Sequence, residues 1–276
     1  MKLKAKAYLK IANEAWRKKY DDAGYFREGL AQVNLKGKYG FVDVTGKEVI
    51  PLKYGDTFSF SEGLGAVQLD GQYGFVDATG KEVIPRKYDS VWPFYKGLAA
   101  VELYGQWGFI DKTGKEVIPL EYNKVDNFSE GLAVVGLGGD EWGKGCKYGF
   151  IDVMGKEVIP LKYDDAGDFS EGFAGVELLG RWGFVDKTGN EVVKPKYDFV
   201  WGFFEGLAPV KLEGKWGFID ETGTEVIPLK YDKVGYFSEG LAKVELKGKW
   251  GYIDKNGNEY WDKTQNQARE QKPPFF

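Results

Sequence analysis

One stretch of the sequence, Leu-Tyr-Gly-Gln-Trp-Gly-Phe-Ile-Asp-Lys-Thr-Gly-Lys-Glu-Val-Ile-Pro at residues 103–119, recurs in seven near copies and limits the possible folds more than any other feature. The copies align on a recurring tyrosine, which is found at Tyr20, Tyr54, Tyr88, Tyr122, Tyr163, Tyr197 and Tyr231. Five of the six steps are 34 residues long, and one step of 41 residues contains an insertion. A repeat of this period predicts structural units that must stack on one another to bury a core.

The stretch predicts three short β-strands separated by two tight turns. Tyr104-Gly105 lies between strand-forming residues and predicts a two-residue hairpin turn with positive φ at the glycine. Asp111-Lys-Thr-Gly114 predicts the second turn, in which the aspartate accepts backbone hydrogen bonds and the glycine is left-handed. Trp107, Phe109 and Val117 supply large or β-branched groups to the sheet. Such a meander cannot bury its apolar face alone.

Each copy opens with a segment such as residues 231–240, which predicts a further short strand or bend that ends in a Glu-Gly turn. The alternation in residues 241–246 predicts a half-buried strand after this turn. The fold class is therefore all-β, with seven tandem 34-residue β-meanders. We favour a closed seven-bladed β-propeller, because closure removes sheet edges. The alternative is an open β-hairpin solenoid, which needs capped ends.

The repeat predicts one continuous array between two different ends. Residues 1–19 are expected to form a basic amphipathic helix that covers an end of the array, or alternatively contacts a partner or a membrane surface. Residues 264–276 are expected to be a tail. The predicted copies are 20–53, 54–87, 88–121, 122–162, 163–196, 197–230 and 231–263.

The Lys-Trp-Gly-Phe-Ile-Asp motif at residues 215–220, combined with Gly-Lys-Glu-Val-Ile-Pro runs such as residues 114–119, resembles the WG-repeat family of bacterial proteins. The resemblance covers about residues 20–263. It implies a β-repeat module in proteins of mostly unassigned role, and it supplies no catalytic residues. Three copies depart from the motif with tyrosine in place of tryptophan, at Tyr39, Tyr73 and Tyr148, and the fifth copy moves its proline to Pro195.

Composition excludes several functional classes. The chain has no histidine and one cysteine, which excludes an internal disulfide framework, a zinc-finger array and imidazole catalysis. The net charge of −4 gives no reason to expect nucleic-acid binding. Carboxylates such as Asp111 and Glu116 could form a hydrolase pair, but they recur in nearly every copy, as turn residues do. We predict no enzymatic activity, no cofactor and no metal. Without an apolar run of membrane-spanning length, a cytoplasmic location is expected.

Candidate binding residues are found where one copy differs from the others. Copies three and six place Trp92 with Tyr95, and Trp201 with Phe204, at positions where most other copies have smaller residues. These aromatics predict a recognition surface, with gap filling between copies as the alternative. The insertion in copy four, residues 138–146, carries Trp142 and predicts a flexible loop that binds a partner or is neutral.

The function predicted from these features is a non-catalytic β-repeat scaffold. It would bind a protein or peptide through the loop aromatics and the N-terminal helix. The first alternative is a glycan or cell-wall binding module, and the second is a carboxylate-based hydrolase.

Overall fold

The structure is a computed structural model that describes residues 15–139 and 145–261. The chain divides into two compact units, Met1–Asn127 and Phe128–Phe276, which are described separately below. Most of the predicted N-terminal helix, the predicted tail and Trp142 lie outside the described residues. Of the predicted helix, only Ala15–Lys19 is described, and it forms a 3-10 helix, η1, in place of an α-helix.

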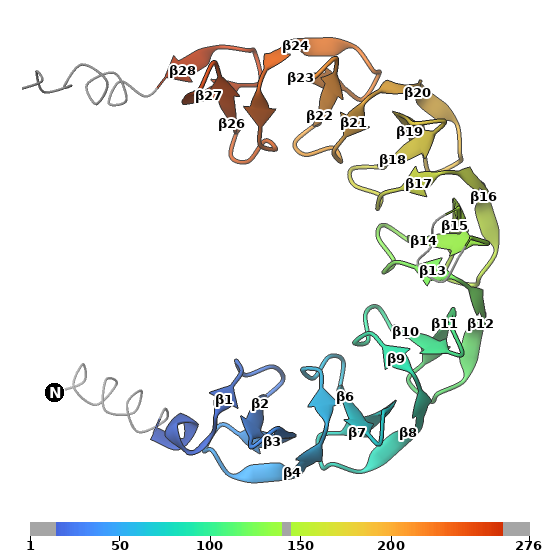
Figure 1. The fold of residues 1–276 in the computed structure, drawn as a ribbon, viewed down its shortest axis with the longest axis vertical. Helices are drawn as coiled ribbons and strands as arrows, with labels where there is room; N and C mark the ends of the chain where they lie inside the picture. Colours follow the sequence, from blue (N-terminus) through green and yellow to red (C-terminus); the bar gives the residue numbers. More distant parts are fainter. Residues whose placement is uncertain (1–14, 140–144, 262–276) are drawn as a thin grey trace, which may run out of the picture. The chain divides into compact units, whose positions relative to one another are not determined.

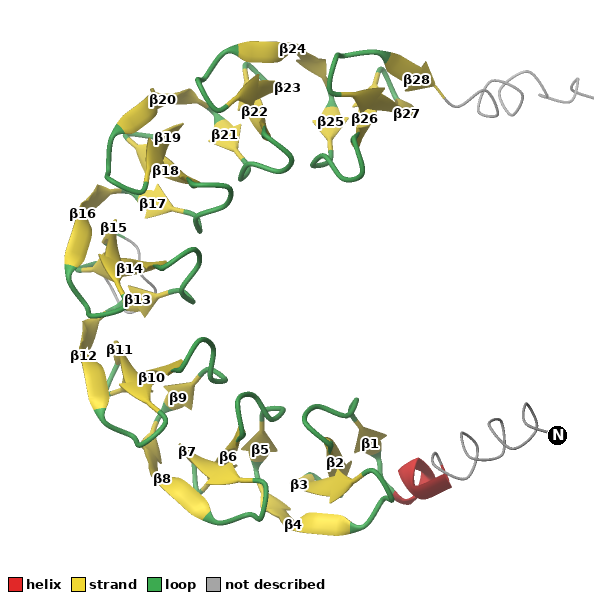
Figure 2. Cartoon of the chain, turned by 180° about the vertical axis from the view of Figure 1, so that it is seen from behind, coloured by secondary structure: helices red, strands yellow, loops and turns green. Residues whose placement is uncertain are grey.

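Every copy folds into a four-stranded antiparallel meander, which confirms the predicted all-β repeat (Figure 1). Apart from η1, the described residues contain only strands and loops (Figure 2). Copies one to three lie in the first unit and copies five to seven in the second. The boundary between the units falls inside copy four, after its first strand.

The four strands occupy equivalent positions in all seven copies. The first strands are β1 (Asp22–Ala23), β5 (Asp56–Thr57), β9 (Ser90–Val91), β13 (Lys124–Val125), β17 (Asp165–Ala166), β21 (Phe199–Val200) and β25 (Lys233–Val234). The second strands are β2 (Leu30–Leu35), β6 (Leu64–Leu69), β10 (Leu98–Leu103), β14 (Leu132–Leu137), β18 (Phe173–Leu178), β22 (Leu207–Leu212) and β26 (Leu241–Leu246). The third strands are β3 (Lys38–Asp43), β7 (Gln72–Asp77), β11 (Gln106–Asp111), β15 (Lys147–Asp152), β19 (Arg181–Asp186), β23 (Lys215–Asp220) and β27 (Lys249–Asp254). The fourth strands are β4 (Glu48–Tyr54), β8 (Glu82–Tyr88), β12 (Glu116–Tyr122), β16 (Glu157–Tyr163), β20 (Glu191–Tyr197), β24 (Glu225–Tyr231) and β28 (Glu259–Trp261).

The hairpin turns follow the predicted chemistry. Gly105 has φ 76°, as predicted, and the preceding Tyr104 also has positive φ, at 54°. Positive φ at both central residues marks a type I′ turn, whose twist matches that of the flanking strands. The Glu-Gly turn between the first and second strands has the same geometry, with φ 55° at Glu62 and 89° at Gly63. A typical copy therefore contains two type I′ hairpins.

The turn between the third and fourth strands is held by its aspartate. The Asp111 Oδ1 atom accepts hydrogen bonds from the backbone N–H of Thr113 at 2.8 Å and from its hydroxyl at 2.6 Å. The N–H of Lys115 donates to the same oxygen at 3.1 Å. Gly114 has φ 82°, which confirms the left-handed position. Because this arrangement recurs in other copies, these carboxylates have a structural role.

The core is built between consecutive copies from phenylalanine rings. Phe75 on β7 packs edge-on against Phe94 of the next copy, with ring centroids 4.9 Å apart, and both rings are about 1% exposed or less. Equivalent pairs join Phe184 to Phe203 and Phe218 to Phe237. Such edge-to-face contacts add to the stabilisation that burial provides. Each meander thus buries its apolar face against its neighbour.

The two residues of the recurring Trp-Gly pair differ in burial, and the tryptophan is not part of the fully buried core. Trp107, Trp182 and Trp216 are only half-buried. The glycine does permit a close backbone approach, because a Cβ atom at Gly108 would lie 2.6 Å from the carbonyl oxygen of Ile118 on the adjacent strand. The glycine is therefore a steric requirement, whereas the tryptophan lies at the edge of the buried cluster.

Trp16 in η1 covers the outer face of copy one. Its side chain is 4% exposed and its ring lies 5.6 Å from that of Phe26. A Cβ atom at Gly46 would lie 2.3 Å from the Trp16 ring, whereas the equivalent Gly80 faces Ile50 of the preceding copy. Trp16 thus takes the place that an isoleucine of a preceding copy occupies elsewhere in the first unit.

Candidate binding surface

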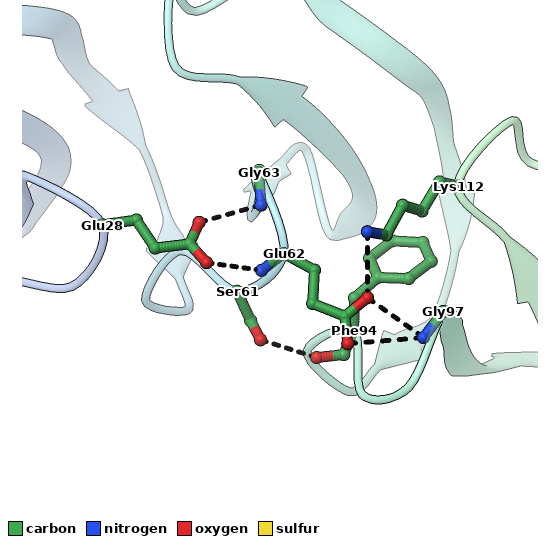
Figure 3. A network of polar contacts seen from close by, with 7 residues as sticks. All are labelled: Glu28, Ser61, Glu62, Gly63, Phe94, Gly97 and Lys112. Atoms are coloured by element: carbon green, nitrogen blue, oxygen red, sulfur yellow. Dashed lines mark hydrogen bonds and ion pairs between the residues drawn. The ribbon is translucent and has the colours of Figure 1, made fainter.

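Within each unit, the Glu-Gly turns link consecutive copies and provide the frame for the surface. The Glu28 carboxylate accepts hydrogen bonds from the backbone N–H groups of Glu62 and Gly63, both at 2.8 Å (Figure 3). In the second unit, Glu171 accepts the equivalent bonds from Glu205 at 2.7 Å and from Gly206 at 2.8 Å. The carboxylate satisfies N–H groups that a type I′ turn leaves without partners in its own copy. We call this contact the glutamate clamp.

Where the following copy offers a lysine, the clamp includes an ion pair. The Glu62 carboxylate accepts a hydrogen bond from the N–H of Gly97 at 3.0 Å and lies 2.9 Å from Lys112 Nζ (Figure 3). Partial burial opposes ionisation of Glu62, but the bonds from Lys112 and Gly97 outweigh it and lower the pKa of this carboxyl group. Glu130 pairs in the same way with Lys187 at 2.9 Å.

A serine next to the Glu-Gly turn makes a second link between copies. The Ser61 hydroxyl donates to the carbonyl of Phe94 at 2.6 Å (Figure 3), and Ser170 donates to Phe203 at 2.7 Å. Tyr95 and Phe204, two of the predicted binding residues, occupy this serine position in copies three and six. A phenyl ring cannot donate this bond, so at Phe204 a stabilising link is replaced by a ring that is 38% exposed.

The structure does not bring the predicted pair of copy three together. Trp92 is half-buried and packs edge-on against Trp107, with ring centroids 6.0 Å apart. Tyr95 is 47% exposed, and Lys96 Nζ lies 5.1 Å from its ring. Among the described aromatic residues of the first unit, no ring contact joins Trp92 to Tyr95.

The predicted pair of copy six is also divided between two contacts. Phe204 packs against Tyr236 of copy seven, with ring centroids 4.8 Å apart. Trp201 is 37% exposed and packs against Trp216 at 5.5 Å. No ring contact links Trp201 to Phe204 in the described part of the second unit. Trp201 instead belongs to a larger cluster.

Four half-exposed aromatic rings of copies five and six form a continuous chain of contacts. The Trp182 and Phe199 ring centroids lie 5.5 Å apart, and those of Phe199 and Trp216 lie 6.1 Å apart. The Trp216–Trp201 contact extends the chain. We call Trp182, Phe199, Trp201 and Trp216 the aromatic platform. The rings come from β19, β21, the segment after β21, and β23, so two rigid sheets hold them in place.

Sequence reasoning missed Phe199, although a signal was present. Phe199 is 39% exposed and contacts two tryptophans, which makes it the centre of the platform. At its position all six other copies have polar residues, namely Asp22, Asp56, Ser90, Lys124, Asp165 and Lys233. Comparison of this position across the copies identifies Phe199 as the exception. The structure adds Trp182 and Trp216. Every copy has tryptophan or tyrosine at this repeat position, so a comparison of the copies could not single them out.

The two copies contribute opposite charges beside the platform. In copy six, Lys211 on β22 is in register with Phe199 on one side and with Trp216 on the other, and its Nζ atom lies 5.8 Å from the Trp216 ring. In copy five, the equivalent β18 residue is Glu177, in register with Asp165 and Trp182. Burial, followed by the charge of Asp165, raises the pKa of Glu177.

The described residues contain no cluster of three or more cysteine or acidic side chains arranged to hold a metal ion. They also contain no helix that is long and apolar enough to cross a membrane. The chemistry of the aromatic platform is that of non-covalent contact: flat apolar rings with one ammonium and one carboxylate beside them.

The fold has relatives among solved structures. A crystal structure of a eukaryotic initiation factor matches 86% of this chain and 74% of its own, with 12% sequence identity and a TM-score of 0.54. Hsv2p of Kluyveromyces lactis matches 84% of this chain and 92% of its own, with 9% identity and a TM-score of 0.44. At this level of identity the likeness concerns the fold alone.

No curated protein matches the chain. The model of the family described as "WG containing repeat" matches seven tandem segments, at residues 18–39, 39–73, 73–107, 107–139, 148–182, 182–216 and 216–250. These segments cover most of the chain and confirm the resemblance inferred from the sequence. The chain is a member of the WG-repeat family.

Proposed function

We propose that this protein is a non-catalytic repeat scaffold that binds a protein or peptide partner on the aromatic platform. The observation that carries the proposal is the chain of four half-exposed rings on copies five and six. Large, rigid aromatic side chains provide much contact area at a small entropic cost, and such residues dominate the energetics of protein interfaces.

The comparison of copies supports a role in binding over a role in packing. Phe199 stands where copy five has Asp165, and Trp201 stands where copy five has Gly167. Copy five nevertheless forms the same four-stranded sheet. The fold therefore does not require aromatic rings at these positions, and a contiguous, partly exposed apolar patch is typical of an interaction surface.

The test uses the residues of copy five as substitutions that the fold tolerates. A random peptide library displayed on phage is selected on the wild-type protein, and the enriched peptides are measured on a Phe199→Asp, Trp201→Gly double variant. We expect affinity to fall by at least about 30-fold, which corresponds to about 2 kcal/mol, while the melting temperature stays within a few degrees. The matched control is Trp92→Gly, which removes a tryptophan at the same repeat position outside the platform.

Two results would contradict the proposal. Equal binding of the enriched peptides to the wild type and the double variant would remove the platform as the site. Failure to enrich any peptide, together with binding of an oligosaccharide panel that depends on Phe199, would favour the glycan-binding alternative.

The arrangement of the copies belongs to the proposal as well. A closed seven-bladed β-propeller is supported by the seven four-stranded meanders, because closure leaves no sheet at an open end of the array. The open β-hairpin solenoid is supported by Trp16, which already covers the outer face of copy one. Spin labels on Asp22→Cys and Lys249→Cys, in a Cys146→Ser background, distinguish the two. Closure places copies one and seven side by side, with sheets about 10 Å apart, and gives a short label distance.

A further inference from the structure

We propose that the aromatic platform selects its peptide by charge polarity. The bound segment would carry an acidic side chain opposite Lys211 and a basic side chain opposite Glu177, in a fixed order along its apolar contact residues. The inference rests on the proposed function and specifies the chemistry of the partner.

Lys211 is a cation introduced at a position that is otherwise neutral or acidic. The equivalent residues in the other copies are Asn34, Gln68, Glu102, Gly136, Glu177 and Glu245. Lys211 lies between Phe199 and Trp216 in the sheet register, and its ammonium group rests beside the Trp216 ring. Within the described residues it forms no ion pair.

Copy seven shows how a charge at this position can be neutralised. Lys233 on β25 forms an ion pair with Glu245 on β26, with 2.8 Å between Nζ and Oε2. Copy six has Phe199 in place of that lysine and Lys211 in place of that glutamate. The cation has therefore moved to the second strand, and the carboxylate that would compensate it is absent. An aromatic ring and an uncompensated ammonium group now lie side by side.

Glu177 provides the opposite charge on copy five. It stands in register with Trp182, at one end of the chain of rings, whereas Lys211 lies further along the chain beside Phe199 and Trp216; Glu177 forms no ion pair within the described residues. The nearby Asp165 adds further negative charge, while Asp164 is paired with Lys147. The two rows across the sheets are thus Asp165-Glu177-Trp182 and Phe199-Lys211-Trp216.

Two other cations of these strands are paired. Arg181 of copy five pairs with Asp198 of copy six, and Lys215 pairs with Asp232 at 2.5 Å. Lys211 on one copy, and Glu177 with its neighbour Asp165 on the other, are left as charges available to a ligand. Charges at the rim of an apolar contact area contribute mainly to selectivity and to the rate of association. A peptide bound across Trp182, Phe199 and Trp216 would therefore contact Glu177 and Lys211 in a fixed order.

The experiment measures the peptides enriched on the wild-type protein against Lys211→Glu, Glu177→Lys and the double exchange. Glutamate is tolerated at position 211, because Glu177 and Glu245 occupy it in neighbouring copies. We expect wild-type peptides to contain both charge signs in a fixed order and to bind Lys211→Glu about tenfold more weakly, the effect of about 1.4 kcal/mol. A new selection on the double exchange should enrich peptides with the order of charges reversed.

Lys247→Glu is the matched control, because it makes the same charge change at an exposed hairpin tip of copy seven. It should leave affinity unchanged. If Phe199→Asp abolishes binding while Lys211→Glu and Glu177→Lys do not alter it, the polarity inference is wrong and the proposed function stands. If peptides bind equally with or without Phe199, the proposed function itself fails. Enriched peptides without an ordered pair of charges would also overturn the polarity inference.

Discussion

Met154 marks the weakest of the aspartate turns. Its backbone N–H donates to Asp152 Oδ1 at 2.9 Å, as in the other copies, but its side chain is 74% exposed and has no hydroxyl group. At the equivalent place in copy three, the Thr113 hydroxyl donates to Asp111 at 2.6 Å. Copy four thus lacks one hydrogen bond and exposes an apolar side chain to water.

Met154→Thr should therefore stabilise the protein. A new hydroxyl bond to Asp152 contributes about 0.5–1 kcal/mol to the free energy of unfolding, which urea denaturation can measure. The control is Val153→Thr, because no side chain at this position bonds to the turn aspartate in the described residues. A lower stability for Met154→Thr would show that apolar contacts of the methionine side chain outweigh the new hydrogen bond.

Truncating two aromatic residues of copy six should lower the free energy of unfolding by very different amounts. Phe218 is fully buried and lies 5.0 Å from Phe237 of the next copy, so Phe218→Ala should cost about 3–5 kcal/mol. Trp201→Gly should cost well under that amount, because Trp201 is 37% exposed and glycine occupies its position in three other copies. Thermal unfolding followed by circular dichroism compares the two. Similar losses would identify Trp201 as a packing residue.

The chemistry of single residues explains what the sequence could predict. Positive φ at Gly105 and the bonds of Asp111 are local, because each depends on residues within one turn. The Phe199 contacts with Trp182 and Trp216 depend on how one sheet lies against the next. No spacing within a copy encodes them. For the same reason Trp92 and Tyr95 looked like a pair in the sequence, whereas in the sheet they belong to different contacts.

At the level of elements, the glutamate clamp links consecutive copies within each unit. Glu171 accepts two N–H bonds from the turn of copy six. Glu171→Ala should cost about 1–2 kcal/mol, since both N–H groups would have to find water. Glu213→Ala, at an exposed hairpin tip of copy six, is the control and should be close to neutral. Equal effects of the two substitutions on urea denaturation would show that the clamp contributes nothing to stability.

The aspartate turns should make the free energy of unfolding depend on pH in the acidic range. The Thr188 hydroxyl and then the Asn190 amide favour the ionised form of Asp186 and lower its pKa from 3.8 to about 2. The pKa values of the turn residues Asp43, Asp77, Asp111, Asp220 and Asp254 are also lowered.

A carboxyl group with a lowered folded-state pKa stabilises the fold fully above the unfolded value and loses that effect as pH falls. The free energy of unfolding should therefore decrease from about pH 4 to pH 2, as melting temperatures across that range can show. Thr188→Val, which removes the hydroxyl, should weaken the Asp186 contribution. A melting temperature that is constant down to pH 2 would contradict this account.

For the whole molecule, the sequence predicted the class of fold because periodicity and turn chemistry are properties of the chain itself. Seven meanders, their strand order and the family all follow from the seven tyrosines and the motif that comes after each. The predicted helix of residues 1–19 was not confirmed, since Ala15–Lys19 form a 3-10 helix. The sequence did not predict that Trp16 would pack against Gly46, because this contact replaces one that other copies make with a neighbour.

Within each unit, the phenylalanine pairs and glutamate clamps join only copies that are consecutive in sequence. When the chain is stretched from its two ends, each copy can consequently unfold as a separate unit while its neighbours remain folded. A copy of 34 residues releases about 110–120 Å of chain when it unfolds, and copy four, with 41 residues, releases about 135–150 Å. In a single-molecule pulling experiment the protein should behave as an extensible tether that lengthens in nearly equal steps, with one longer step for copy four.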